Sequence, residues 1–155
     1  EWAVSRIDVN KLKQNMPAVG MNIACCLESS RSTAEVAAFP GKVTIVENKL
    51  RHHETPTFGA SNHLANMLLV VRTHDKDKTS ILNIHPGGDK DAIESMCEDL
   101  DLNLTFASKG ELSPHQGIDV ILDEGAFGWE PALYILAHNP LELVDRMHKI
   151  ISVLN

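Results

Sequence analysis

The sequence lacks the features that would place it in several specialised classes of protein. Its longest apolar run, Pro131–Ala137, has seven residues, whereas crossing a bilayer takes about 20. No charged-then-apolar leader opens the chain, so we expect no secretory signal. Acidic residues outnumber basic ones 21 to 14, and the formal charge of -7 repels phosphate backbones. The composition argues against a membrane protein and against direct nucleic-acid binding by this segment.

Cysteine is also scarce. The three cysteines are the adjacent pair Cys25–Cys26 and Cys97, an odd number without CxxC spacing. This usage favours reduced thiols in a cytoplasmic protein over a disulfide framework. Neighbouring residues on a strand point to opposite faces, so the pair is poorly placed to chelate one metal ion. We interpret these cysteines as small buried side chains.

What is present is the composition of one ordinary globular domain. The chain has 155 residues, of which 43% are hydrophobic and 23% charged, and about 150 residues make one typical domain. We therefore treat residues 1–155 as a single domain. The chain begins with Glu1 rather than Met, which suggests a fragment of a longer protein. Residues 2–15 predict a weak helix with Trp2, Val9, Leu12 and Met16 on one face, and we interpret residues 1–15 as a linker helix from an upstream domain.

Helix and strand patterns alternate along the rest of the chain, which indicates an α/β domain with a mixed sheet. Ser32 and Glu35 have capping-box spacing for a helix that Pro40 stops within one or two turns. Asn139 and Pro140 cap and open the last helix. Strands are expected at 22–27, 80–84, 102–107, 118–122 and 132–137, a hairpin at 43–51 turning at Asn48–Lys49, and longer helices at 62–72, 89–100 and from 140 onward.

The segment before the helix at 62–72 is the most informative one for function. Ser61 is a good N-cap, and Phe58, Gly59 and Ala60 form a glycine-containing loop in front of it. Free backbone N–H groups and the positive end of the helix dipole converge at such a junction, which makes it suited to a phosphate or pyrophosphate. His63 lies in the first turn, off the apolar stripe, and the dipole favours its neutral form. The alternative is an ordinary cap with a solvated histidine.

Two further junctions carry polar residues. Asp89 follows Gly87–Gly88 at the start of a helix, where its own carboxylate favours self-capping over anion capture. Asp123 and Glu130 follow a buried strand, where α/β sheets usually keep their binding crevice. They would hold Mg²⁺ or hydrogen-bond a heterocycle, unless they are ordinary loop carboxylates. No Ser-His-Asp order, P-loop or HExxH motif is present.

Taken in order, several motifs resemble the archaeal-type thiamine-phosphate synthase (ThiN) family from about residue 16 to the end. The segments that carry the resemblance are Met16–Asn22, Glu35–Lys42, Phe58–Ala65, Leu82–Ile84, Asp119–Asp123 and Gly128–Pro131. The resemblance implies a three-layer αβα fold like that of AraD-type class II aldolases, commonly in a homodimer. It also implies that hydroxymethylpyrimidine diphosphate and thiazole phosphate condense to thiamine phosphate and pyrophosphate, with Mg²⁺ as a candidate cofactor.

The resemblance assigns roles to individual residues. The family's arginine after Pro-Gly and its histidine in the Phe-Gly-Ala-Ser motif carry catalysis, which places those roles on Lys42 and His63. The ligand-binding candidates are Asn22, Phe58, Gly59, Ala60, Ser61, Asn62, Asn83, Asp123, Trp129 and Glu130.

Three departures from the family pattern remove or weaken positive charge. Lys42 replaces an arginine and so loses the bidentate fork that grips phosphate. Trp129 stands where a lysine is typical, and His85 where an arginine is typical. These changes are expected to impair departure of pyrophosphate more than binding, because charge develops only in the departure step. Two functions therefore follow from the resemblance: the synthase, and a non-catalytic sensor of thiamine phosphates joined to an upstream DNA-binding helix-turn-helix module in a transcriptional regulator.

Overall fold

The computed structural model describes residues 1–113 and 115–155. Its strands are β1 (Ile23–Cys26), β2 (Val36–Ala38), β3 (Val43–Val46), β4 (Lys49–His52), β5 (Thr57–Phe58), β6 (Ser80–Ile84), β7 (Leu104–Ala107), β8 (Val120–Asp123) and β9 (Ala132–Ala137). Its α-helices are α1 (Trp2–Ser5), α2 (Val9–Leu12), α3 (Asn62–Arg72), α4 (Lys90–Asp99) and α5 (Pro140–Leu154), and its 3-10 helices are η1 (Lys13–Asn15) and η2 (Thr33–Glu35).

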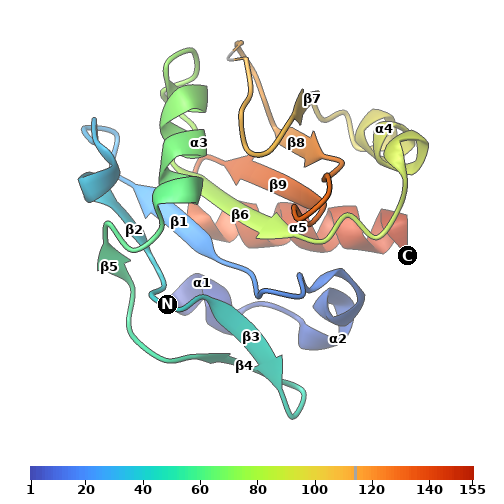
Figure 1. Cartoon of the computed structure of the whole chain (residues 1–155), viewed down its shortest axis with the longest axis horizontal. Helices are drawn as coiled ribbons and strands as arrows, with labels where there is room; N and C mark the ends of the chain where they lie inside the picture. The colour runs from blue at the N-terminus through green and yellow to red at the C-terminus, as the bar shows by residue number, and fades with distance from the viewer. Residues whose placement is uncertain (114) are drawn as a thin grey trace.

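A mixed seven-stranded sheet forms the middle layer, with the strand order β5-β2-β1-β6-β9-β8-β7. β7 and β8 run parallel, whereas the other neighbouring strands are antiparallel. The hairpin of β3 and β4 forms a separate small sheet, which lies beside the main one (Figure 1). A bridge between Met21 and Val43 joins this hairpin to the segment before β1.

Helices cover both faces of the sheet, which confirms the predicted α/β architecture and its three layers. α3 packs over one face, above a core that includes Ala24, Leu68 and Ile81. α1, α2, α4 and α5 cover the other face, around Leu82, Ile135 and Met147. In Figure 1, α3 lies in front of the sheet and α5 behind it. The all-buried strand β9 contributes alternate side chains to the two cores, as the two-residue period of a strand requires.

The structure confirms the cysteine interpretation in part, because Cys97 is buried whereas Cys25 and Cys26 are half-buried. Cys25 packs with the core beneath α5 and Cys26 with the core beneath α3, so the adjacent side chains point to opposite faces. Burial raises the pKa of both thiols and raises that of Cys97 to about 11. All three are free cysteines that remain protonated at neutral pH.

The long elements lie close to their predicted positions. α3 and the strands β6 and β9 match the predicted ranges, and α4, β7 and β8 differ by one or two residues at their ends. The predicted N-caps all accept backbone hydrogen bonds: Ser61 from Leu64, Asp89 from Ala92, and Asn139 from Glu142. Asp89 therefore caps its own helix, as expected.

The prediction of one helix over residues 2–15 was wrong. Asp8 adopts an extended backbone and caps a new helix by accepting from the N–H groups of Asn10 and Lys11, so the segment breaks into α1, α2 and η1. The predicted apolar face is also incorrect in part, because Trp2 is 63% exposed while Ala3, Val4, Ile7 and Leu12 are buried.

Two local predictions shift by short distances. The capping box of Ser32 and Glu35 is present, but its helix is a single 3-10 turn that ends before β2. The residues that we expected to remain helical up to Pro40 instead form β2, which pairs with β1. The hairpin turns at Glu47–Asn48 rather than at Asn48–Lys49, with both residues in the left-handed region at φ 50 and 60, as a two-residue hairpin turn requires. No helix in the described ranges is long and apolar enough to cross a membrane.

Candidate functional site

A cavity of about 330 Å³ lies on the α3 face of the sheet. It is bordered by the ends of β1, β6 and β9, by the first turn of α3, and by the loops before β1 and before β9. The residues that line it are Pro17, Val19, Asn22, Lys42, Ser61, His63, Leu64, Asn83, Gly128, Trp129, Glu130, Pro131, Ala132 and Tyr134. Five separated segments of the chain therefore meet at one place.

The first turn of α3 presents polar groups to this cavity. Ser61 adopts an extended backbone, and its hydroxyl oxygen accepts from the N–H of Leu64 at 3.4 Å. The N–H groups of Asn62 and His63 have no acceptor among the described residues. These donors and the positive end of the helix dipole favour a bound anion.

His63 is held between two aromatic side chains. Its Nε2 lies 2.7 Å from the hydroxyl oxygen of Tyr134. The rings of His63 and Tyr134 meet edge to face with centroids 5.5 Å apart, and Trp129 approaches edge-on from a centroid distance of 5.8 Å. The imidazole therefore has one defined orientation in the cavity.

The surroundings of His63 favour its neutral form. Burial lowers the pKa of His63 below its usual value, Lys42 lowers it further, and the Asp123 carboxylate opposes both. The direction agrees with the prediction of a neutral histidine. Burial, with a further contribution from Asp123, also raises the pKa of Tyr134 to about 12. The His63–Tyr134 pair is therefore uncharged at neutral pH.

Asp123 fastens the loops around the cavity. This carboxylate is 2% exposed, and it accepts from the N–H groups of Gly110 at 2.9 Å and Gly125 at 3.0 Å. It also accepts from the indole Nε1–H of Trp129 at 3.1 Å. Asp123 thus fixes the ring of Trp129 without lining the cavity itself, and both its oxygens are used by the protein.

Lys42 reaches the cavity through an unusual backbone. Gly41 and Lys42 are both in the left-handed region, at φ 71 and 68, which is unfavourable for a lysine and is often found at functional sites. The turn sends the chain from β2 into the hairpin and leaves Lys42 as the single Lys or Arg among the cavity-lining residues of the described chain.

The two asparagines of the cavity have different surroundings. The side chain of Asn22 is used by the backbone, because it accepts from the N–H groups of Ile23 and Phe39 and donates to the carbonyl of Phe39. Asn83 accepts from the N–H of Asn22 at 2.8 Å. Its amide N–H groups have no acceptor among the described residues and are available to a ligand.

The structure brings together seven of the twelve residues predicted from the sequence to form the site. Those that line the cavity are Asn22, Lys42, Ser61, His63, Asn83, Trp129 and Glu130. Glu130 also accepts from the N–H of Ala18 at 2.7 Å through Oε1, which fixes the loop before β1.

The other five predicted residues lie outside the lining of the cavity, for local reasons. Phe58 belongs to the edge strand β5 and is 64% exposed. Ala60 packs against the core beneath α3, and Asn62 is exposed on the outer side of the first helical turn. Gly59 has open space around it, and Asp123 acts through Trp129 and Gly110.

Sequence reasoning missed Tyr134. It is the only hydroxyl-bearing side chain of the apolar strand β9, and a buried tyrosine usually finds a hydrogen-bond partner. That signal singles out Tyr134, but its partner lies 71 positions earlier in the chain, so the pairing becomes visible only in the fold.

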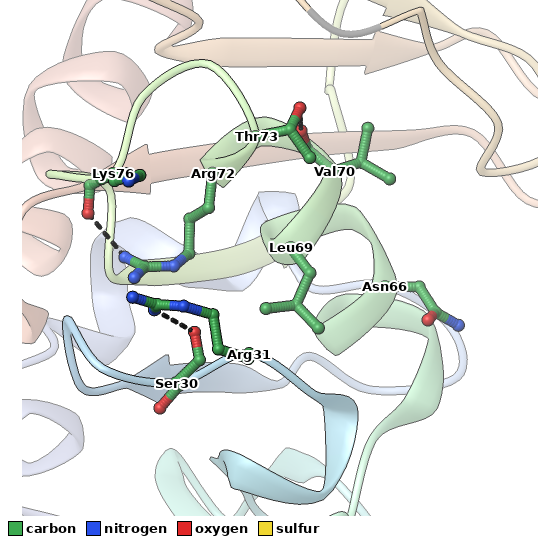
Figure 2. A pocket seen from close by; sticks show the side chains of 8 residues that line it. All are labelled: Ser30, Arg31, Asn66, Leu69, Val70, Arg72, Thr73 and Lys76. Carbon is green, nitrogen blue, oxygen red and sulfur yellow. Dashed lines mark hydrogen bonds between the residues drawn. The ribbon is translucent and has the colours of Figure 1, made fainter.

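A second cavity, of about 420 Å³, lies at the opposite end of α3. Figure 2 shows its lining side chains, with the guanidinium groups of Arg31 and Arg72 side by side. Arg72 is 5% exposed and donates to the carbonyls of Leu27, Glu28, Lys76 and Lys78. Through these contacts Arg72 joins two loops, which is a structural role. We therefore assign the functional site to the cavity of His63.

Fold and site together define an α/β domain with a histidine-bearing, anion-suited cavity at the first turn of α3. A family model described as "Thiamine-phosphate synthase ThiN" matches residues 1–149, and the chain belongs to this family.

Two curated relatives support the assignment. The chain is 25% identical over 160 aligned positions to "Thiamine-phosphate synthase ThiN" of Methanothermobacter thermautotrophicus, covering 88% of this chain and 81% of that protein. It is 28% identical over 155 positions to "Bifunctional thiamine biosynthesis protein ThiDN" of Methanocaldococcus jannaschii, covering 90% of this chain and 37% of that protein. The chain thus spans little more than a third of the bifunctional relative.

Two solved structures share the fold. The C-terminal domain of a phosphomethylpyrimidine kinase superposes with a TM-score of 0.75 at 21% identity, covering 96% of this chain and 98% of that one. The C-terminal domain of protein MJ0236 gives a TM-score of 0.77 at 23% identity, covering 98% and 91%. At these identities the likeness concerns the fold.

Proposed function

We propose that this chain is a thiamine-phosphate synthase, which joins hydroxymethylpyrimidine diphosphate to thiazole phosphate in the cytoplasm. The observation that carries the proposal is the meeting of His63, Lys42 and the first turn of α3 in one cavity of a ThiN-family domain. Two phosphorylated substrates require this kind of place, where donors and positive charge converge.

In the proposed reaction, the ring nitrogen of the thiazole attacks the methylene carbon of the pyrimidine. A C–N bond forms while the C–O bond to the diphosphate breaks, and its electron pair leaves with pyrophosphate. Negative charge therefore grows on the leaving oxygen, where hydrogen-bond donors contribute most to the rate. Lys42, His63 and the first turn of α3 are the groups suited to receive that charge, and the amide of Asn83 is suited to orient a heterocycle.

We propose that Mg²⁺ binds together with the diphosphate substrate, and not at a metal site formed by the protein alone. Asp123 has both oxygens engaged by N–H donors, and no group of three or more His, Cys, Asp or Glu side chains in the described ranges is arranged to hold a metal ion. Glu130 has one carboxylate oxygen without a hydrogen bond to the described residues. Mg²⁺ usually binds through one or two carboxylates together with substrate phosphates, so Glu130 is the side chain to contact it, and the ion would neutralise charge on the diphosphate.

The direct test is an assay with both phosphorylated precursors and Mg²⁺, with thiamine phosphate as the measured product. His63→Ala and Lys42→Ala should each lower kcat by at least about 100-fold, as expected when a group that stabilises developing charge is lost. His74→Ala is the matched control, because His74 follows the other end of α3 and contacts Thr73 rather than the cavity. Full activity of His63→Ala would reject the assigned role.

The alternative function, a sensor of thiamine phosphates in a transcriptional regulator, predicts a different result. This alternative is supported by the low positive charge of the cavity, whose described lining residues include one lysine and no arginine, whereas the synthase reaction requires two phosphorylated substrates. Calorimetry would then detect thiamine phosphate binding in the absence of turnover, and His63→Ala would weaken the binding. Light scattering in the same buffer tests the homodimer that we propose on the family resemblance.

A further inference from the structure

The hydroxyl group of Tyr134 has one hydrogen, which it can donate to a single acceptor. Tyr134 is 3% exposed, and its pKa of about 12 keeps the hydroxyl protonated under ordinary conditions. Within the described ranges, its one hydrogen-bond partner is Nε2 of His63, at 2.7 Å. Two arrangements are possible, because either the hydroxyl donates to Nε2 or an Nε2–H group donates to the hydroxyl oxygen.

The first arrangement satisfies both groups. If Tyr134 donates, its hydrogen is used and Nε2 of the neutral ring is the acceptor. If Nε2 carries the hydrogen instead, the hydroxyl hydrogen of this buried side chain has no acceptor among the described residues. A buried donor without a partner is unfavourable. The hydrogen of the neutral ring is therefore expected on Nδ1.

The Nδ1 edge of the imidazole faces Gly110, and Nδ1 has no hydrogen-bond partner among the described residues. A Cβ atom at Gly110 would lie 2.6 Å from Cε1 and 3.1 Å from Nδ1 of His63. Gly110 has φ +79, and its N–H is held by Asp123, so the backbone at this position is fixed. Only glycine allows the backbone to come this close to the imidazole.

We propose that Tyr134 is a positioning residue that holds His63 as the Nδ1–H tautomer, so that the imidazole donates a hydrogen bond from Nδ1 to an oxyanion in the cavity that His63 lines. The identity of that oxyanion as a phosphate or pyrophosphate group rests on the proposed function, whereas the tautomer does not. His63 then stabilises charge through its N–H group rather than removing a proton.

The chain contains two internal standards for a test by nitrogen-15 NMR of the histidine side chains. Nε2 of His148 accepts from the backbone N–H of Asp8 at 2.9 Å, so a neutral His148 must carry its hydrogen on Nδ1. Nδ1 of His85 accepts from the backbone N–H of Gly87 at 3.1 Å, so a neutral His85 must carry its hydrogen on Nε2. Spectra of His63→Ala, H148Q and H85Q assign the three signals.

In alkaline buffer, where imidazole rings are neutral, the wild-type His63 signals should match the pattern of His148. A pattern like that of His85, or an average of the two, would overturn the proposal. Tyr134→Phe keeps the ring that packs beneath α3 and removes only the hydroxyl, and in this variant the His63 signals should move toward the averaged pattern while those of His148 stay in place. The wild-type spectrum alone decides the question if this variant does not fold.

A kinetic measurement distinguishes this role from a structural one. If His63 donates to a leaving group, Tyr134→Phe should lower kcat about tenfold and change KM by less than about twofold, because the interaction matters where charge develops. An unchanged kcat would reject the positioning role. A chain that makes no thiamine phosphate but shows the His148-like pattern would retain the proposed tautomer and lose the proposed function.

Discussion

Arg31 and Arg72 donate to the same acceptor, the carbonyl oxygen of Glu28, over distances of 2.8 and 2.9 Å. The two guanidinium groups are not equivalent. Arg31 is exposed, whereas Arg72 is buried and joins the loop after β1 to the loop before β6 through four carbonyl oxygens. Figure 2 shows how Arg72 extends from the end of α3 toward both.

Arg72→Met should therefore destabilise the chain by about 3 kcal/mol, because it leaves several buried carbonyls without a donor. Arg31→Met should cost less than about 1 kcal/mol, since its group is solvated. Urea denaturation followed by circular dichroism measures both. Equal losses in the two variants would mean that the shared carbonyl, rather than burial, sets the contribution of each arginine.

Lys78 and Asp119 form a largely buried ion pair with an N–O distance of 2.6 Å and side-chain exposures of 5% and 13%. Burial alone would raise the pKa of Asp119, but the Asn103 N–H, Lys78 and Arg146 together hold it below its usual value. Lys78→Met should cost about 3 to 5 kcal/mol, as expected when one partner of a buried pair is removed.

The matched control for Lys78 is Lys90, whose contact with Glu94 is exposed and 3.9 Å long. Lys90→Met should cost less than about 1 kcal/mol in the same denaturation experiment. A Lys78→Met variant as stable as Lys90→Met would show that Arg146 alone can balance Asp119.

The stability of the fold should fall with acidification in the range where histidines titrate. Burial and the nearby Lys11, opposed by Asp8 and Asp145, lower the pKa of His148. The unfolded chain therefore takes up a proton near pH 6.5 while the folded chain resists, so this contribution is present above that pH and is lost as the pH falls through the folded-state pKa. H148Q keeps an acceptor for Asp8 without titrating, and its unfolding free energy should decline less between pH 7 and pH 5. An unchanged slope would assign the effect to other groups.

Asp123→Asn should loosen the site as well as the fold. An asparagine amide has only one oxygen that accepts, and its NH₂ group cannot accept from an N–H. The free energy of unfolding should therefore fall by about 1 to 3 kcal/mol. The indole N–H signal of Trp129 should shift at the same time, because its acceptor has changed. Asp99→Asn, at an exposed position near the end of α4, is the control, and an unmoved Trp129 signal in D123N would contradict the fastening role of Asp123.

The features that the sequence predicted best are those set by interactions between residues close together in the chain. The cap at Ser61, the apolar stripe of α3 and the proline that opens α5 act within one or two turns, and these helices match their predicted ranges. β2 and β5 have three and two residues, too few for a periodicity. β2 forms because β1 provides an edge to pair with, and β5 because β2 does. The break at Asp8 was missed because apolar spacing does not report a cap inside a segment.

The site was predicted in part for the same reason. Lys42 and His63 were found because each lies in a motif of adjacent residues. Tyr134 and Gly110 act on His63 from β9 and from the loop after β7, across separations that no local pattern spans. Phe58 and Asn62 lie five positions and one position before His63 in the sequence, but strand alternation and helical rotation turn them away from the cavity.

The cavity of His63 draws its walls from segments between Pro17 and Tyr134, joined by a sheet whose strand order departs from chain order. No short stretch of the chain can reproduce it, so the cavity exists only in the folded domain and is lost when the domain unfolds. A small molecule that occupies it would therefore delay thermal melting of the whole domain, by an amount set only by its concentration and affinity.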